Sequence, residues 1–229
     1  MSIFTIGDPH LSLASEKPMD IFAGWGNYTE RLEQCWRNTV SDGDTVVLAG
    51  DISWAMTLDE ARADFAFLDA LPGSKIILKG NHDYWWTTMR KMENWAEECG
   101  FSTIRFLFNN SYIISGYGIC GTRAWYINEA ECDNKKILAR ELGRLRASID
   151  TLDLDVCSGA AAFLHYPPIY RGSILTDIVE LLKVKGIEKC YYGHLHGASI
   201  NHAFCGMHDG IEFKLISADY LKFAPYKIN

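Results

Sequence analysis

The amino-acid sequence predicts an α/β fold, because two patterns run through the chain together. Short apolar segments alternate with longer segments that have helical spacing, an arrangement typical of α/β cores. Each of the five clearest short segments also runs directly into a cluster that contains Asp, Asn or His. The chain has 229 residues with no visible linker, so we expect one domain over residues 1–229, large enough to bury its core without disulfides.

The first half of the chain predicts three strands, two helices and a hairpin. Residues 3–6, 45–49 and 75–79 are short, apolar and bounded by turn residues, as buried strands are. Residues 58–71 and 84–99 are interpreted as helices between them. Residues 104–121 resemble a hairpin, with apolar residues on both sides of Gly116-Tyr117-Gly118.

The second half predicts two helices, two strands and another hairpin. A helix is expected over 131–150, where Leu138, Leu142, Leu145 and Ile149 lie on one helical face, and a second over 174–182. Residues 161–164 and 189–192 are predicted strands, and 198–217 a hairpin that turns at Asp209-Gly210. Hairpins added to parallel strands imply a mixed sheet, or two sheets packed together.

The charge and the cysteines exclude several classes of protein. With 22 Lys+Arg against 29 Asp+Glu, the net charge is −7, which argues against nucleic-acid binding and against docking on an anionic membrane. No apolar segment is long enough to span a membrane, and the first residues lack the features of a signal peptide. The seven cysteines form no CxxC pair, so we expect a cytoplasmic protein with reduced thiols.

The polar clusters that follow the five strands predict a metal site. The carboxyl ends of parallel strands lie at one edge of a sheet, so these side chains are expected to meet there. They are Asp8, His10, Asp51, Asn81, His82, Asp83, His165, His194 and His196. Carboxylates and imidazoles together are ligands of transition metals, and these donors exceed the need of one ion. Two ions that share a bridging carboxylate would use them, and such pairs promote phosphoryl transfer.

In chain order, the motifs resemble the signature of the calcineurin-like metallophosphoesterases. They are Asp8-x-His10, Gly50-Asp51, Gly80-Asn81-His82-Asp83, His165 and Gly193-His194-x-His196. The resemblance extends from Asp8 to His196 and implies two mixed sheets packed as a sandwich between helices. It also implies two divalent transition-metal ions per chain, with Mn, Fe and Zn left open.

The resemblance implies a role for each motif residue. Asp8, His10 and His196 would hold the first ion, Asp51 would bridge both, and Asn81, His165 and His194 would complete the second. His82 would act as general acid or as electrostatic stabiliser of the transition state, and Asp83 is the nearest candidate in sequence to orient it. A hydroxide that bridges the ions would attack phosphorus in line.

One motif departs from the protein phosphatase branch of the family. There the second block reads GDxxDRG, whereas here Trp54 and Ala55 replace its second Asp and its Arg. A phosphoprotein phosphatase is therefore disfavoured, and the chain resembles the small bacterial-type phosphohydrolases instead. Arg123 and Arg171 are candidates to bind the substrate phosphate in place of the missing Arg, the alternative being that each is a surface arginine.

The predicted function is hydrolysis of a small phosphodiester or phosphomonoester. A non-catalytic scaffold with the same fold is the alternative. The aromatic residues 84–86 and 125–126 either line a substrate opening or pack inside the fold, and the sequence leaves both open. His202 and His208 lie outside the motifs and are expected to be structural. Two bound divalent ions would offset part of the negative charge, so that charge does not exclude an anionic substrate.

Overall fold

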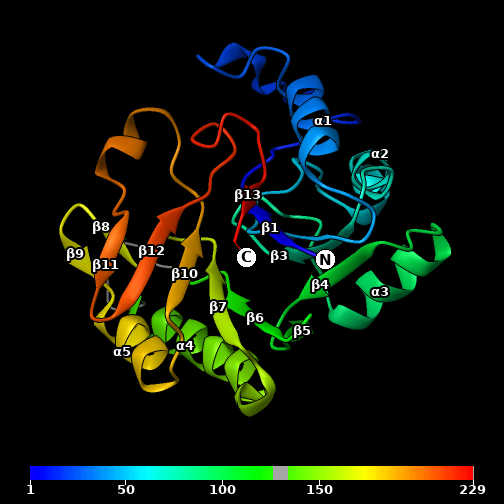
Figure 1. Ribbon diagram of the computed structural model, residues 1–229. Helices are drawn as coiled ribbons and strands as arrows, with labels where there is room; N and C mark the ends of the chain where they lie inside the picture. Colours follow the sequence, from blue (N-terminus) through cyan, green and yellow to red (C-terminus); the bar gives the residue numbers. More distant parts are fainter. Residues whose placement is uncertain (126–133, 229) are drawn as a thin grey trace.

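The computed structural model describes residues 1–125 and 134–228, and its described part contains two large β-sheets that pack face to face (Figure 1). The first sheet has the strand order β13-β1-β2-β3-β4. Its strands are β1 (Ile3–Ile6), β2 (Thr45–Leu48), β3 (Ser74–Leu78), β4 (Ile104–Leu107) and β13 (Tyr226–Lys227). β1 to β4 are parallel, whereas β13 runs antiparallel along the edge of β1.

The second sheet has the strand order β11-β12-β10-β7-β6-β5. Its strands are β5 (Tyr112–Ile114), β6 (Tyr117–Thr122), β7 (Gly159–Leu164), β10 (Lys189–Tyr192), β11 (Gly206–His208) and β12 (Ile211–Leu215). The four central strands are parallel and the two edge strands are antiparallel. A separate small hairpin consists of β8 (Ile169–Tyr170) and β9 (Ser173–Ile174).

Helices cover the outer face of each sheet and complete four layers (Figure 1). α1 (Tyr28–Thr39), α2 (Leu58–Asp69) and α3 (Met89–Glu98) lie on the first sheet, and α4 (Asn134–Asp150) and α5 (Thr176–Val184) on the second. Short 3-10 helices occupy Met19–Ile21, Leu154–Val156 and Gly197–His202. The α/β class and the two-sheet sandwich are thereby confirmed. Within the described residues, no helix has the length and hydrophobicity needed to cross a membrane.

The core consists of three layers of apolar side chains, and β2 shows why. Val46 and Leu48 pack toward the helices of the first sheet, whereas Val47 and Ala49 pack toward the second sheet. Because successive residues of a strand point to opposite faces and both faces are covered, the whole segment is buried. This is the physical reason that the central strands have continuous apolar sequences.

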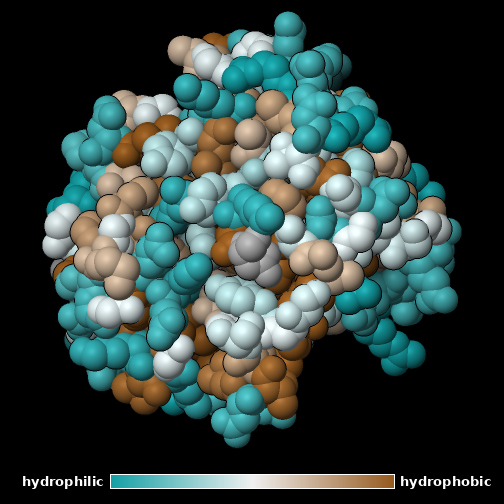
Figure 2. All heavy atoms as spheres, viewed as in Figure 1, coloured by the Kyte–Doolittle hydropathy of each residue, from teal (hydrophilic) through white to brown (hydrophobic). Residues whose placement is uncertain are grey.

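On the surface, hydrophilic residues cover most of the face seen in Figure 2, with hydrophobic residues in separate patches.

Two predictions about local structure were wrong. Residues 104–121 do not form one hairpin, because β4 pairs in parallel with β3 in the first sheet while β5 and β6 form a hairpin in the second. The helix expected at 84–99 begins only at Met89, since Asp83 accepts a hydrogen bond from Trp85 Nε1 and the side chains of Trp85 and Trp86 are buried in the core. Helix α1 was not predicted at all.

The hairpin expected over 198–217 is shorter than predicted, because Gly197–His202 form a 3-10 helix and only β11 and β12 pair. The strands β8, β9 and β13 were not predicted, and the other predicted elements lie within a few residues of their expected positions. Thr57 caps α2 by accepting a hydrogen bond from the backbone N–H of Glu60. The turn at Asp209-Gly210 joins β11 to β12 as expected. The helix expected at 131–150 is observed from Asn134, and residues 131–133 lie outside the described part of the chain.

Substitution of Phe163 tests the packing between the sheets. Its ring is fully buried there and stacks on Tyr191 with 5.4 Å between the ring centroids. We expect Phe163→Ala to lower the free energy of unfolding by about 3–5 kcal/mol, because it leaves a cavity in the core. Urea denaturation measures this, with Ile113→Ala, on the exposed edge strand β5, as the control. Equal losses in the two variants would contradict the packing described here.

Candidate metal centre

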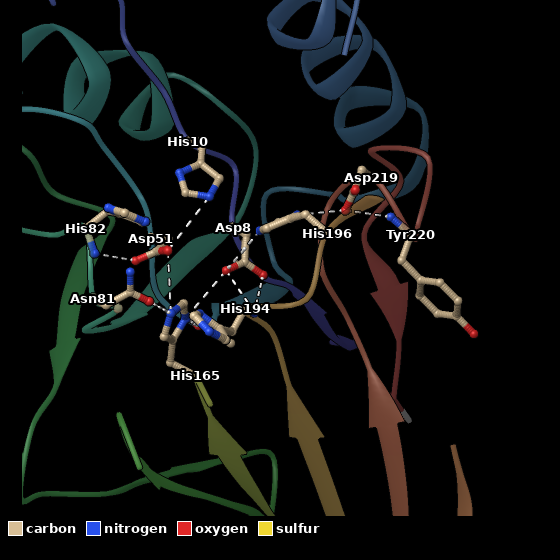
Figure 3. Close-up of polar contacts among 12 residues, drawn as sticks. Asp8, His10, Asp51, Asn81, His82, His165, His194, His196, Asp219 and Tyr220 are labelled. Carbon is tan, nitrogen blue, oxygen red and sulfur yellow. Dashed lines mark hydrogen bonds and ion pairs between the residues drawn. The ribbon is translucent and has the colours of Figure 1, made fainter. Parts of the chain in front are cut away.

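The motif residues from the five predicted strand ends meet in one space between the two sheets (Figure 3). Asp8 and His10 follow β1, Asp51 follows β2, and Asn81 follows β3, all from the first sheet. The second sheet contributes residues after β7 and β10, namely His165, His194 and His196. Asp8, Asp51 and His165 are almost completely buried, so polar groups that water would otherwise solvate are concentrated inside the protein.

The side chains form two adjacent groups that could each hold a metal ion. One consists of Asp8, His10 and His196, the other of Asp51, His165 and His194, and the candidate ligand atoms within each lie within 4.8 Å of one another. Asp51 Oδ2 lies 3.7 Å from His10 Nε2 and 3.5 Å from His165 Nε2, so this oxygen stands between the two groups.

The hydrogen bonds of His165 indicate that a cation fits the second group. Its Nδ1 lies 3.0 Å from the carbonyl oxygen of Ala49, which can only accept, so Nδ1 carries the hydrogen. The lone pair of Nε2 then faces Asn81 Oδ1 at 2.7 Å and the Asp51 carboxylate. Oxygen and nitrogen lone pairs that converge in this way repel each other unless a cation lies between them.

The first group has unsatisfied polar atoms that also fit a cation. His10 Nδ1 and His196 Nε2 are buried and have no hydrogen-bond partner among the described residues. Buried polar atoms in proteins are almost always satisfied, so each such atom needs an explanation. A divalent ion next to the Asp8 carboxylate would satisfy the lone pair of His196 and offset the buried negative charge.

The pKa values of the histidines are mostly those of neutral ligands. Burial lowers the pKa of His10 and of His165, and it lowers the pKa of His194 to about 3. Neutral imidazoles have a free lone pair and can therefore bind a metal. His196 differs, because its hydrogen bond with Asp219 and the negative charges of Asp8 and Asp219 outweigh burial and raise its pKa to about 10.

The two carboxylates have opposite pKa shifts. Burial would raise the pKa of Asp8, but the close approach of His196 and the charges of the surrounding histidines outweigh it and hold that pKa below its usual range. Burial and the charge of Asp8 raise the pKa of Asp51 to about 8. Two buried carboxylates this close repel each other, and divalent cations are the usual way in which proteins keep both ionised.

The backbone around the site is strained and tightly packed. Asp8, His10, Asp51 and His194 have positive φ values of 56°, 47°, 51° and 72°. This left-handed conformation costs about 1–2 kcal/mol for a non-glycine residue, and such strain concentrates at functional sites. Gly80 must be glycine for a different reason, since a Cβ there would overlap Asp51 Oδ1.

Asp83 does not have the surroundings expected of a residue that orients His82. Its buried carboxylate accepts hydrogen bonds from the backbone N–H groups of Asp51, Ile52 and Gly80 and from Trp85 Nε1, at 2.7–3.1 Å. Among the described contacts none joins it to the His82 imidazole. Burial, with the charge of Asp51, raises its pKa to about 7. Asp83 therefore links the loops after β2 and β3, and these contacts lend no support to a role in orienting the His82 imidazole.

Trp54 contacts the His82 ring instead. Its ring centroid lies 4.3 Å from that of His82, and it stacks on His10 at 5.0 Å with an interplanar angle of 20°. The backbone N–H of His82 donates to Asp51 Oδ1 at 2.7 Å. Trp54 occupies the position of the second Asp in the GDxxDRG block, so an aromatic ring stands where that block has a carboxylate. Burial and the neighbouring His165 lower the pKa of His82.

The two candidate phosphate-binding arginines lie outside the cluster of ligand atoms. Arg123 Nη2 lies 3.9 Å from the carboxylate of Glu141, and its guanidinium stacks over Trp125 at 4.5 Å. Arg171 is exposed in the turn between β8 and β9, over the ring of Tyr170 at 5.3 Å.

The aromatic residues that the sequence left open have mostly structural positions. Trp85 and Trp86 are buried in the core, while Tyr84 is 53% exposed. Trp125 packs on Arg123, and Tyr126 lies outside the described residues.

Sequence reasoning missed Asp219, whose carboxylate lies 2.9 Å from His196 Nδ1 (Figure 3). The same carboxylate accepts a hydrogen bond from the backbone N–H of Gly197. β12 is parallel to β10, so the segment after it reaches the same edge of the sheet. A polar residue after a strand was therefore the available signal, but residues 198–217 were interpreted only as a hairpin.

Comparison with known proteins agrees with this arrangement. The family model for calcineurin-like phosphoesterases matches residues 1–198. No curated protein matches the chain. The solved structure of a phosphopantetheinyl hydrolase from Mycobacterium tuberculosis is similar, with 14% identity, a TM-score of 0.61, and coverage of 99% of this chain and 95% of that one. A protein of unknown function from Aquifex aeolicus has 15% identity, the same coverage and a TM-score of 0.49. At these identities, the similarity to solved structures concerns the fold alone.

Substitution of Asp219 tests whether His196 belongs to a metal site. We expect Asp219→Asn to weaken binding of one ion by about 10–100-fold, because carboxylates that orient ligand histidines contribute this much to metal affinity. Calorimetric titration of metal-free protein with Mn²⁺ measures it. Asp209→Asn is the matched control, since Asp209 is exposed and pairs only with Lys183 among the described residues. Unchanged affinity in Asp219→Asn would place His196 outside any metal site.

Proposed function

The chain belongs to the calcineurin-like phosphoesterase family, and from that premise we propose that it is a phosphohydrolase with two metal ions that cleaves a small phosphodiester or phosphomonoester. The family supports metal-dependent hydrolysis of phosphoesters in general. The observation that carries the finer proposal is the position of Asp51 Oδ2, which lies between two groups of candidate ligands. One carboxylate between two such groups is the arrangement of a dinuclear centre.

Each ion has a proposed set of ligands. Asp8, His10 and His196 would hold the first, Asn81, His165 and His194 would hold the second, and Asp51 would be shared by both. When bound, two divalent ions of Mn, Fe or Zn lower the pKa of a water enough to supply hydroxide near neutral pH and neutralise charge on the phosphoryl oxygens. The chain contributes the geometry, because backbone hydrogen bonds to Asp8 and Asp51 fix both carboxylates before any ion arrives.

His82 is proposed to act on the phosphate. It lies at the edge of the two groups, with its ring held against Trp54 and a buried Nδ1 that has no partner among the described residues. Because its pKa is lowered, its imidazole is neutral at pH 7 in the free protein. A neutral imidazole still donates one N–H, so we favour His82 as a hydrogen-bond donor that stabilises the transition state over a general acid that is protonated beforehand.

One domain over residues 1–229 is part of the same proposal. The strand β13 closes the edge of β1, and Asp219 contacts His196, so segments distant in sequence complete the same sheet and the same site. We place this domain in the cytoplasm on the grounds of its cysteine pattern, and its acidic charge favours a small substrate over a nucleic acid.

Hydrolysis of aryl phosphates tests the proposed function directly. Protein freed of metal with a chelator is reloaded with Mn²⁺, Zn²⁺ or Mg²⁺ and assayed with p-nitrophenyl phosphate and bis(p-nitrophenyl) phosphate. We expect at least one transition metal to raise turnover about 100-fold or more, and Asp51→Asn to abolish this gain. Asp209→Asn is the control. If two ions bind and neither ester is hydrolysed, the protein is a non-catalytic scaffold.

The role of His82 predicts a loss of rate without a loss of metal. We expect His82→Ala to lower kcat by about 10²–10⁴-fold while two ions per chain remain bound. Metal analysis and steady-state kinetics measure the two effects, and His208→Ala, far along the chain in β11, is the control. A variant that loses an ion would show that His82 is a ligand.

A further inference from the structure

A cavity of about 510 Å³ lies next to the second group of candidate ligands. We call it the His194 pocket. The residues that define it here are Tyr166, Tyr170, Arg171, Leu175, His194 and Ser199. Because His194 forms part of its wall, a phosphate held over the ions would have its organic group at the entrance of this pocket.

Rigid elements build the walls of the His194 pocket. The ring of Tyr166 packs on that of His194 with 4.1 Å between the centroids, so the pocket and the candidate metal group share a wall. Pro167 and Pro168, which also line it, have a fixed φ and so restrict the backbone of this wall. Leu175 is 8% exposed and closes one side with an apolar surface. A preformed, mostly apolar cavity of this size is typical of a site for a small molecule.

The turn of the hairpin β8–β9 positions Arg171, the permanently charged residue in the described lining of the pocket. Arg171 and Gly172 both have positive φ, 50° and 80°, the combination that a tight two-residue hairpin turn requires. The guanidinium lies over the ring of Tyr170 at 5.3 Å. Arg171 is exposed, so its charge stands at the mouth of the pocket and not inside it.

The charge of the lining selects the kind of molecule that fits. Among the described residues that line the pocket, none is Asp, Glu or Lys, and Arg171 is the one arginine. A cationic group finds no carboxylate in this lining and is repelled by Arg171. An aromatic or apolar group is compatible with the walls, and an anion is compatible with the mouth.

We propose that the His194 pocket binds the organic group of a phosphoester substrate. This organic group is aromatic or apolar, and it carries a second anionic group within reach of Arg171. This inference rests on the proposed function, since it needs the phosphate to lie over the two ions. It goes further by assigning a substrate class and a specificity residue. Tyr166, Tyr170 and Leu175 accept the apolar part, and Arg171 pairs with the anion.

Binding of phosphonates tests the pocket without hydrolysis, because their P–C bond is stable to the enzyme. The probes are methylphosphonate, phenylphosphonate, 4-carboxymethylphenylphosphonate and 4-ammoniomethylphenylphosphonate, titrated calorimetrically into Mn²⁺-loaded protein. We expect the phenyl compound to bind about tenfold more tightly than the methyl compound, since it buries a ring. The carboxymethyl group should add roughly twofold to fivefold at low ionic strength, as exposed ion pairs do, and the ammoniomethyl group should weaken binding.

Two variants assign the effects to residues. Arg171→Gln should remove the advantage of the carboxymethyl compound and leave the ratio of phenyl to methyl unchanged. Ser173→Trp, at an exposed position that lines the pocket, should fill it and weaken every aryl compound while methylphosphonate binds as before. Arg90→Gln, exposed on α3 and absent from the pocket lining, is the control for loss of a positive charge.

The outcomes separate this inference from the proposed function. Equal binding of all four phosphonates, together with metal-dependent hydrolysis of an aryl phosphate, would overturn the pocket assignment and leave the function standing. An equal effect of Arg171→Gln on all four would remove Arg171 as the specificity residue. If no phosphonate binds and no ester is hydrolysed, both the function and the pocket assignment are wrong.

Discussion

Hydrogen bonds from the candidate ligands hold the two sheets together at the edge where the site lies. The carboxylate of Asp8, in the first sheet, accepts from the backbone N–H of His194, in the second, at 2.9–3.0 Å. His165 of the second sheet bonds in turn to the carbonyl of Ala49 at the end of β2. The bond to the Asp8 carboxylate is charge-assisted, and the bond between His165 and Ala49 is buried. Both properties strengthen a hydrogen bond. The same side chains thus define the joint between the sheets and the geometry of the site.

Most of the site could be predicted from the sequence because its residues follow strands whose signals are local. The segment that forms β2 is apolar on both faces, and the turn after it contains glycine and Asp51, so the strand and its polar end are visible within a few residues. The role of Asp83 could not be predicted in this way. Asp83 follows His82 directly, yet its carboxylate points to the backbone of the β2 loop, and only the tertiary structure shows this.

The errors in the fold have a similar cause. β4 and β5 are close in sequence and both are apolar, but they belong to different sheets, and no local pattern marks the point at which the chain crosses. In α1, Tyr28, Leu32 and Trp36 recur every fourth residue and form the buried face, while the residues between them are mostly polar. A long polar stretch with three apolar anchors is a weak signal in sequence, although Trp36 is fully buried in the structure. Long-range packing decides such cases.

Asp8 and Asp219 have a consequence for the order in which the protein is assembled. During synthesis, β1 and Asp8 emerge early. The Asp8 carboxylate accepts a hydrogen bond from the backbone N–H of His194, which is made much later. His196 is in turn held by the carboxylate of Asp219, which is later still. A ribosome must therefore release nearly all of the residues up to 219 before the first ligand group can close. Contacts between such distant segments form slowly, because the loop entropy is lost before the contacts stabilise the chain. The nascent chain thus passes through a period in which β1 and Asp8 are already outside the ribosome without their partners. Binding of an ion by this group would therefore belong to the last stage of folding.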